Sequence, residues 1–421
     1  MELAAAHFIF DVTTQTSRVS HNPWLHRFAV LTAAATLILV CIGGLVTSHG
    51  VGMSVPDWPT SYGYNMFALP IRFWTGGIFY EHTHRLWATF VGVLVVALTR
   101  WLGGRQSRFS LAIIGLAEVL AGFGIFLLWP KLKPTGHFLT GIGGVVLLAA
   151  LVWVRNERAE RPLPALGWTA FWLVQFQGLL GGLRVVLLED QIGIFHGALA
   201  QIFFVLLCVI ALFTSRKWKN ARPFAVSKAL RVGAVVGTAL IFLQLILGAT
   251  MRHQHAGLAV SDFPLAHGKL WPDTDPASIQ RYNEERIEIS SVKPITAFQV
   301  QLHMAHRVTA LVILIVVGFC AGTAFRKFRW RSAPGKGSAL WLALILTQVA
   351  LGAATVLTHK AADVATAHVL VGAVSLATGF ILCLFCFRNF GFTESTPVLS
   401  ANIDGKKSGK LMSAGSGAAH S

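Results

Sequence analysis

Charged residues are scarce in this sequence of 421 residues. Asp, Glu, Lys and Arg together make up 13% of it and hydrophobic residues 54%, whereas a typical soluble domain contains about 25% charged residues. This deficit excludes an ordinary soluble protein. The mean hydropathy of +0.61 and repeated apolar runs of about 18 residues or more instead indicate a protein embedded in a membrane.

Acidic residues are the rarest charged type. The 18 Asp and Glu residues face 35 Lys and Arg residues, which gives a net charge of +17. Most of the basic residues stand in short clusters between apolar runs, where such clusters set the orientation of membrane helices. We therefore attribute the positive charge to topology and expect a lipid bilayer, not a nucleic acid, as the partner.

Cysteine is absent from the polar segments. All five cysteines lie inside apolar runs, so none is placed to staple an exported loop with a disulfide. Cys383 and Cys386 form a C-x-x-C sequence, which we interpret as a pair of small buried hydrophobic residues within a membrane helix.

The two ends of the sequence lack long apolar runs. Residues 1–27 contain Glu2 and Asp11 and no small-residue cleavage site after a short apolar core, so they do not read as a targeting signal. We predict a cytoplasmic N-terminal segment over 1–27. Residues 392–421 are rich in Gly, Ser, Lys and Ala, and we predict that this cytoplasmic tail is disordered.

The apolar runs predict ten membrane spans. Each is long enough to cross about 30 Å of hydrocarbon as a helix, and lipid offers no hydrogen-bond partners for an open strand. The predicted spans are 28–47, 84–102, 109–129, 138–155, 165–186, 191–214, 229–250, 303–325, 338–358 and 363–387.

The connections between these spans alternate in charge. One set holds clusters such as Arg100, Arg105 and Arg108, whereas the long connection 48–81 holds only Arg72 and the connection 187–190 holds no basic residue. The positive-inside rule places the basic set in the cytoplasm. We therefore predict a multi-pass inner-membrane protein with both termini cytoplasmic and the loops 48–81 and 251–298 outside.

The two long outer loops share a sequence motif. Residues 52–59 and 257–264 both read G-[ML]-[SA]-V-x-D-[WF]-P, and the helix that follows each loop begins with a similar sequence, Glu81-x-x-His84-Arg85 or His303-x-x-His306-Arg307. Further matches follow in the same order: Gln177-Gly178 with Gln348-Val349, then His196 with His368. Four ordered matches predict two homologous halves.

The halves differ in length. From His84 to Gln177 the first half is 51 residues longer than the second half is from His306 to Gln348, which is room for one extra helical hairpin. We predict an all-α membrane protein made of two four-helix bundles, 28–214 and 229–387. The hairpin 109–155 is an insertion into the first bundle, and we expect it to pack peripherally.

Four histidines recur at matching places in the two halves. Two helices that each offer one imidazole at equal depth can hold a haem iron from its two sides, with the axial nitrogens about 4 Å apart. A single membrane histidine is more often a packing residue, but a matched set at one depth favours ligation because imidazole is costly in lipid. The four predicted ligands are His84, His196, His306 and His368.

Charged residues beside these histidines differ between the halves. Glu81 lies one helical turn before His84, where the second half has His303. A carboxylate there can relay protons or stabilise a developing cation, or it can simply be a solvated acid at a helix start. Arg85 and Arg307 are either haem propionate partners or interfacial arginines.

The segment 55–59 combines Pro with Trp. Pro restricts the backbone, and Trp favours the boundary between water and lipid. We expect this segment either to fold back over the outer mouth of the first bundle or to lie at the interface without contacting a site.

Taken together, these residues resemble the haem A synthase family. The resemblance covers most of the chain outside 109–155 and the tail, and it rests on Pro56-Asp57-Trp58-Pro59, Glu81-x-x-His84-Arg85, Gln177-Gly178, His196, His306-Arg307 and His368. It implies conversion of a haem O methyl to the formyl of haem A for terminal oxidases, with water as the oxygen source and a cationic intermediate.

The resemblance also implies separate roles for the halves. Haem b would stay between His306 and His368, substrate haem O would bind between His84 and His196, and Glu81 would serve the reaction. Many members of the family carry a cysteine pair in an outer loop and have eight helices, and this chain departs from both patterns. An electron acceptor, haem O synthase and oxidase assembly factors are the implied partners.

Two other functions use similar features. A di-haem cytochrome b that takes electrons from quinol needs the same four histidines, but it would keep both haems. A haem transporter built from repeats needs broken helices at mid-membrane, whereas here the polar residues gather near the outer face.

Overall fold

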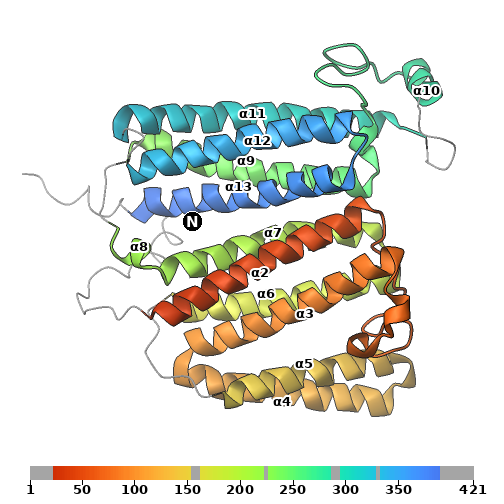
Figure 1. Cartoon of the computed structure of the whole chain (residues 1–421), viewed down its shortest axis with the longest axis vertical. Coiled ribbons are helices and arrows are strands. Elements are labelled where there is room, and N and C mark those ends of the chain that lie inside the picture. Colours follow the sequence, from red (N-terminus) through yellow and green to blue (C-terminus); the bar gives the residue numbers. More distant parts are fainter. Residues whose placement is uncertain (1–21, 153–161, 222–225, 286–293, 329–331, 389–421) are drawn as a thin grey trace, which may run out of the picture.

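The computed structural model describes residues 22–152, 162–221, 226–285, 294–328 and 332–388 (Figure 1). Most of the predicted N-terminal segment 1–27 and the whole predicted tail 392–421 lie outside the described residues.

Nine helices in the described residues are long and apolar enough to cross a membrane. Asn22, Ser227 and Ser332 cap three of them by accepting backbone N–H groups. These helices are α2 (Pro23–Ser48), α3 (Gly76–Leu102), α4 (Gly104–Leu128), α6 (Leu163–Leu187), α7 (Asp190–Phe213), α9 (Lys228–His253), α11 (Ala297–Phe328), α12 (Ala333–Leu357) and α13 (Ala362–Arg388).

The tenth predicted span is a shorter helix. It was expected over 138–155, and α5 covers Lys133–Leu151, of which Thr135–Leu151 is the apolar part. Short helical segments occur at the ends of the long ones: η1 (Met66–Ala68), η2 (Ile71–Phe73), η3 (Pro130–Leu132), α8 (Arg216–Lys219), η4 (Ala256–Leu258) and α10 (Pro276–Glu284).

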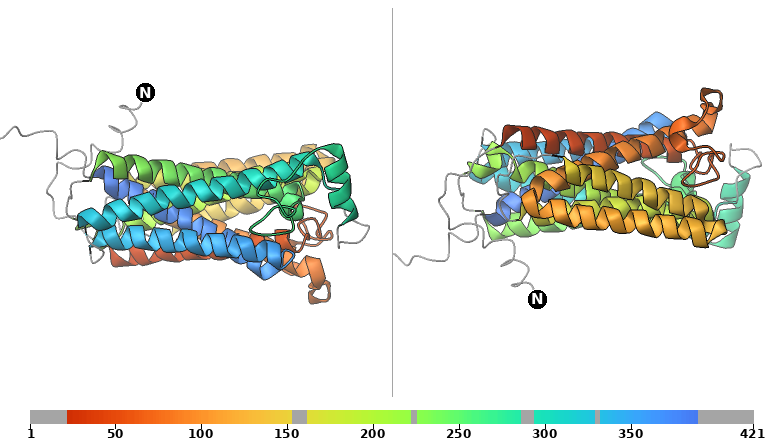
Figure 2. Two further views of the ribbon diagram at one scale, coloured as in Figure 1. Left: turned by 90° about the horizontal axis from the view of Figure 1, so that it is seen from above. Right: turned by 90° about the horizontal axis from the view of Figure 1, so that it is seen from below.

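Eight of these nine long helices, all except α4, form two groups of four, side by side with their axes roughly parallel (Figures 1 and 2). In the first group α2 packs on α3, α3 on α6, α6 on α7 and α7 on α2; in the second, α9, α11, α12 and α13 form the same closed ring of contacts. The groups, called here the first and second bundle, meet through α2 and α7 on one side and α9 and α13 on the other. The predicted all-helical membrane fold is confirmed.

Each bundle has an apolar interior, while its outer surface is also apolar. Val91, Leu98 and Leu207 lie in the buried cluster of the first bundle, and Val317 and Trp341 in that of the second. Large apolar side chains on the periphery remain exposed, for example Phe109 at 72% and Ile315 at 63%. Such exposure is unfavourable in water and favourable in lipid.

The helices α4 and α5 form a hairpin against α3, on the flank of the first bundle away from the second (Figure 1). Their backbones approach closely at small residues: a Cβ on Gly122 would lie 2.6 Å from the carbonyl of Gly136, and one on Gly115 would lie 2.8 Å from that of Gly143. Close approach at small residues is the usual way in which membrane helices associate.

Both long loops lie at one end of the bundles, on the right in Figure 1. We call this end, which carries residues 49–75, 254–285 and 294–296, the loop end. The helix α3 begins at Gly76, eight residues before the predicted start, and α11 begins at Ala297, six residues early. The extra turns of α3 contain the buried polar residues Glu81 and His82.

Candidate functional site

The four repeated histidines lie on four different helices at similar depth. His84 is on α3, His196 on α7, His306 on α11 and His368 on α13. His84 and His306 lie eight and nine residues into helices that begin well before their predicted starts, and His196 and His368 lie six residues into theirs. Each histidine is therefore about two turns in from the loop end. The histidines of each half face one bundle, and the two pairs lie in different bundles.

Each histidine ring packs against a glycine of a neighbouring helix. A side chain at any of these glycines would push the ring away, since a Cβ there would lie within about 3.5 Å of the ring carbon Cε1. The distances from such a Cβ to Cε1 are 3.1 Å for Gly43 and His84, 3.5 Å for Gly181 and His196, 3.3 Å for Gly248 and His306, and 3.3 Å for Gly352 and His368.

Glutamine side-chain amides hydrogen-bond to the backbone carbonyls of three of the four histidines. The Nε2 group of Gln177 donates to the carbonyl of His196 at 3.1 Å, that of Gln244 to His306 at 2.9 Å, and that of Gln348 to His368 at 2.8 Å. Each glutamine precedes the glycine under the same ring by one helical turn. The sequence prediction included Gln177 and Gln348 but missed Gln244, because the corresponding position in the first half is Leu39.

The second pair of rings is spaced to hold one metal ion between them. The ring centres of His306 and His368 lie 6.4 Å apart, with the planes inclined by 61°. An imidazole nitrogen lies about 2 Å from its metal, and its ring centre lies about 1 Å further on. Two imidazoles on opposite sides of one metal therefore have ring centres about 6 Å apart, which agrees with the observed distance.

The ring atoms lack other partners among the described residues. The Nδ1 atoms of His84, His196, His306 and His368 are buried without a hydrogen bond, while each residue as a whole remains partly accessible. A buried imidazole without a partner is unfavourable. No group of three or more His, Cys, Asp or Glu in the described residues could hold a bare metal ion, so these pairs suit a haem, whose porphyrin supplies four further nitrogens.

Glu81 is a buried, paired acid. Only 4% of its surface is exposed, its Oε2 accepts the backbone N–H of Val55 at 2.8 Å, and its Oε1 accepts the Arg85 guanidinium at 2.7 Å. The alternative of a solvated acid at a helix start does not match this burial. In the second bundle His303, 3% exposed, occupies the corresponding position.

Arg85 and Arg307 hold the two long loops. The guanidinium of Arg85 donates to the carbonyls of Val55, Asp57 and Thr60 at 2.6–3.1 Å. The guanidinium of Arg307 donates in the same way to Asp262 at 2.6 Å and Leu265 at 2.8 Å. Their predicted contact with haem propionates stays a prediction, and the described contacts give both residues a loop-anchoring role.

An aspartate holds a turn in each of these loops. The carboxylate of Asp57 accepts the backbone N–H groups of Tyr62 and Gly63, and Asp262 accepts those of His267 and Gly268. Partial burial alone would raise the pKa of Asp57, but the hydrogen bonds from Thr60 and from these backbone groups outweigh it and hold the pKa below its usual value.

The inserted hairpin reaches the first site through Trp58. The Trp58 indole packs so closely on Gly182 that a Cβ there would lie 2.3 Å from the ring, and its centroid lies 4.4 Å from that of Phe138 on α5. The segment 55–59 therefore folds back onto the bundle. Its counterpart Phe263 is 39% exposed and packs under Arg307 instead.

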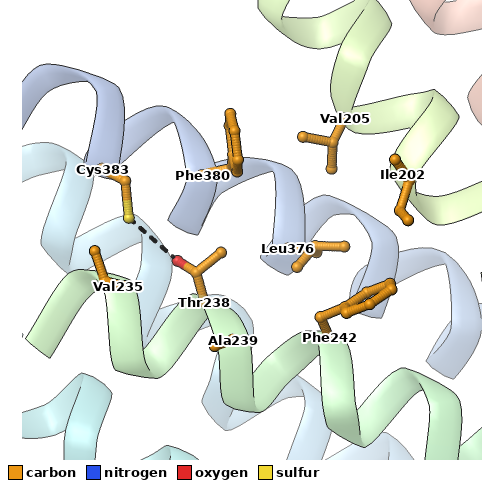
Figure 3. A pocket seen from close by; sticks show the side chains of 9 residues that line it. All are labelled: Ile202, Val205, Val235, Thr238, Ala239, Phe242, Leu376, Phe380 and Cys383. Atoms are coloured by element: carbon orange, nitrogen blue, oxygen red, sulfur yellow. Dashed lines mark hydrogen bonds between the residues drawn. The ribbon is translucent and has the colours of Figure 1, made fainter. Parts of the chain in front are cut away.

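An apolar cavity lies between the bundles, away from the histidines (Figure 3). Its volume is about 360 Å³, and its walls come from α7, α9 and α13, including Val205, Phe242 and Leu376. The polar atoms of Thr238 and Cys383 contact each other at 3.5 Å. The lining contains no histidine and no charged side chain.

Comparison with known proteins identifies the family of this chain. A sequence profile described as "Cytochrome oxidase assembly protein" matches residues 137–380, which is more than half of the chain. The chain belongs to this family. The matched residues include His196, His306 and His368, while Glu81 and His84 precede them.

Individual relatives in this family are similar over much of their length. A protein of Shouchella clausii named heme A synthase is 26% identical over 355 residues, which cover 80% of this chain and 98% of the relative. A heme A synthase of Listeria welshimeri is 27% identical over 259 residues, 59% of this chain and 76% of the relative. A third, from Halalkalibacterium halodurans, is 25% identical over 60% of this chain and 78% of its own length.

Proposed function

We propose that this protein is a haem A synthase, an oxidoreductase that converts a peripheral methyl of haem O to the formyl of haem A. The observation that carries the proposal is the set of four matched histidines in a chain of this family, each ring seated on a glycine. Relatives that carry the name heme A synthase cover up to 80% of the chain, which supports the same activity here.

We infer that the second bundle holds a resident haem b between His306 and His368. Glutamine amides brace the carbonyls of both these histidines, and the 6.4 Å ring spacing suits one iron. The bound haem b would supply one-electron redox chemistry beside the reacting site.

We place the substrate haem O between His84 and His196 in the first bundle. Only His196 of this pair has a glutamine brace, so this site is less tightly held and better suited to exchange a ligand. It is also the site with the buried acid Glu81 on the histidine helix.

The reaction requires an oxygen atom and an electron acceptor. Conversion of a methyl to a formyl takes the oxygen of one water molecule and releases four electrons and four protons. Glu81 lies one turn from His84, where its carboxylate can take up a proton and stabilise positive charge that develops on the substrate. To do so it must exchange its contact with Val55 N–H or with Arg85. The electron acceptor is unidentified.

We infer that the chain spans the inner membrane with both ends cytoplasmic and that its bundles arose by duplication. Basic clusters such as Arg100, Arg105 and Arg108 favour the cytoplasmic side for the end opposite the loops. The equal contacts of Asp57 and Asp262, and of Arg85 and Arg307, support the duplication. Haem O synthase and terminal oxidase assembly factors are the partners that this function requires.

The direct test is to identify the haems in the purified protein. Extraction followed by mass analysis should give haem b together with haem O, a hydroxylated intermediate or haem A. His306→Ala or His368→Ala should remove the low-spin haem b, because each pair shares one iron; His137→Ala on the hairpin serves as the control. Two equivalents of haem b and no haem O or haem A would indicate an electron-transfer cytochrome instead.

A further inference from the structure

Arg252 stands apart from the other arginines near the loop end. It lies in the last turn of α9, four residues after Gly248, the glycine under the His306 ring. Residues four apart share a face of a helix, so Arg252 lies one turn further toward the loop end on the face that packs against this histidine.

The guanidinium of Arg252 contacts the first bundle. Its two η nitrogens donate to the hydroxyls of Thr47 at 2.7 Å and Ser48 at 2.5 Å, at the end of α2. The Ser48 hydroxyl lies 3.2 Å from that of Thr366, which precedes His368 by two residues on α13. The side chain of Arg252 is thus connected through Ser48 to α13, the helix of His368.

The positive charge of Arg252 is not balanced within the described part of the chain. Both of its hydrogen-bond partners are neutral hydroxyls, in contrast to Arg85, which pairs with Glu81 at 2.7 Å. A partly buried cation without a counter-charge is unfavourable at a membrane site. The position therefore suits a ligand that brings a carboxylate.

The haem of the second bundle would bring two carboxylates, its propionates. Arg252 is linked through Ser48 and Thr366 to the first turns of the His368 helix, whereas Arg307, the other arginine near this site, is held by the carbonyls of Asp262 and Leu265. Arginine and carboxylate form strong charge-assisted hydrogen bonds.

We propose that Arg252, oriented by Thr47 and Ser48, binds a propionate of the haem held between His306 and His368. This inference rests on the proposed function, since it requires a haem at that pair. It also means that the first bundle takes part in the second haem site, because the two hydroxyls that orient Arg252 belong to α2.

The experiment compares haem with its dimethyl ester, in which the propionates carry no charge. Full-length protein from haem-limited cells is titrated with ferric haem and with the ester, following the low-spin spectrum. The natural protein should bind haem at least about tenfold more tightly than the ester. In Arg252→Gln the preference should fall to about twofold or less, with a low-spin spectrum for both ligands. The midpoint potential of the bound haem should also fall, because a nearby cation favours the reduced state.

Arg307→Gln is the matched control, and it should keep the preference for the free acid. A full preference in Arg252→Gln would overturn the proposal, and loss of preference in Arg307→Gln alone would transfer the role to Arg307. If Arg252→Gln does not fold, the double variant Thr47→Val, Ser48→Ala takes its place. It keeps the charge of Arg252 but removes the two hydroxyls that orient it, so the preference for haem over the ester should fall several-fold. An unchanged preference in this double variant also counts against the proposal. If the natural protein forms no low-spin complex with either ligand, the haem site itself is wrong.

Discussion

Each ligand histidine ring packs against the backbone of a neighbouring helix. Gly43, Gly181, Gly248 and Gly352 place main-chain atoms directly under the four rings, so a ring cannot tilt without moving a helix. Closely packed interiors have low compressibility and therefore resist such small displacements. This arrangement fixes the imidazoles by helix packing rather than by hydrogen bonds to their Nδ1 atoms, which have none among the described residues.

At the residue scale, the first prediction concerns the charge of Glu81. In Glu81→Gln the side chain can still accept the Val55 N–H, but it loses the ion pair with Arg85 and cannot accept a proton as a base. We expect haem O conversion to slow by about 100-fold or more, with unconverted haem O or a hydroxylated intermediate in the extract.

The control for Glu81→Gln is His303→Gln at the corresponding position of the second bundle. It tests whether a buried substitution there disturbs the protein in general, and it should leave conversion much closer to the natural rate. Both variants should retain the spectrum of haem b. Wild-type conversion by Glu81→Gln would show that this residue only ties the loop to α3.

The four histidines could be predicted from the sequence because each has a counterpart in the other half. Arg252 was missed because it has no such counterpart. The first-half position that lies four residues after Gly43 is Thr47, so Arg252 has no repeated partner. The sequence also could not reveal that Arg85 and Arg307 donate to loop carbonyls, because backbone acceptors leave no trace in residue identity.

At the scale of elements, hydropathy predicted where the helices cross lipid but not where they start. The first turns of α3 contain the buried residues Glu81 and His82, which a scale based on transfer to lipid counts as outside. The helix α10 was missed because it is short and polar. It is stabilised by an Asp275 cap and by the stacking of Tyr282 on His267 at 3.6 Å.

The inserted hairpin gives a prediction at this scale. Gly122→Leu would place a side chain against the carbonyl of Gly136, where a Cβ already comes within 2.6 Å, and we expect a cost of about 1–3 kcal/mol in unfolding free energy. As α5 moves, Phe138 should lose its contact with Trp58. The thermal unfolding temperature should fall, and the KM for haem O should rise.

Gly124→Leu is the matched control, because it lies two residues away on α4 and a Cβ there meets nothing within 4 Å. It should change neither the unfolding temperature nor the KM. If Gly122→Leu lowers stability while the KM stays constant, the hairpin supports the fold but not the first site.

At the scale of the whole molecule, the prediction concerns topology. Thr135 lies at the loop end, near the start of α5, and should be outside, whereas Ala159, which follows this helix in the sequence and lies outside the described residues, should be inside. Reporter fusions at these two positions should therefore give opposite signals. A fusion at Tyr64 in the first long loop should agree with Thr135. Identical signals at Thr135 and Ala159 would mean that α4 and α5 do not both cross.

The contact between the bundles could not be derived from the sequence. The helices α2, α7, α9 and α13 meet at this contact, and hydropathy does not distinguish a helix face that packs on another membrane helix from one that meets lipid. The duplication hypothesis anticipates two similar bundles but says nothing of how they pack.

The inclination of the His306 and His368 rings has a magnetic consequence. Parallel imidazole planes split the two iron d orbitals that overlap with them, whereas planes 61° apart make the two orbitals more nearly equal in energy. A ferric low-spin haem between these rings should therefore have a strongly anisotropic electron paramagnetic resonance spectrum, with its largest g value well above that of a haem whose axial rings are parallel. A spectrum of the parallel-ring type would mean that the rings turn when they bind iron.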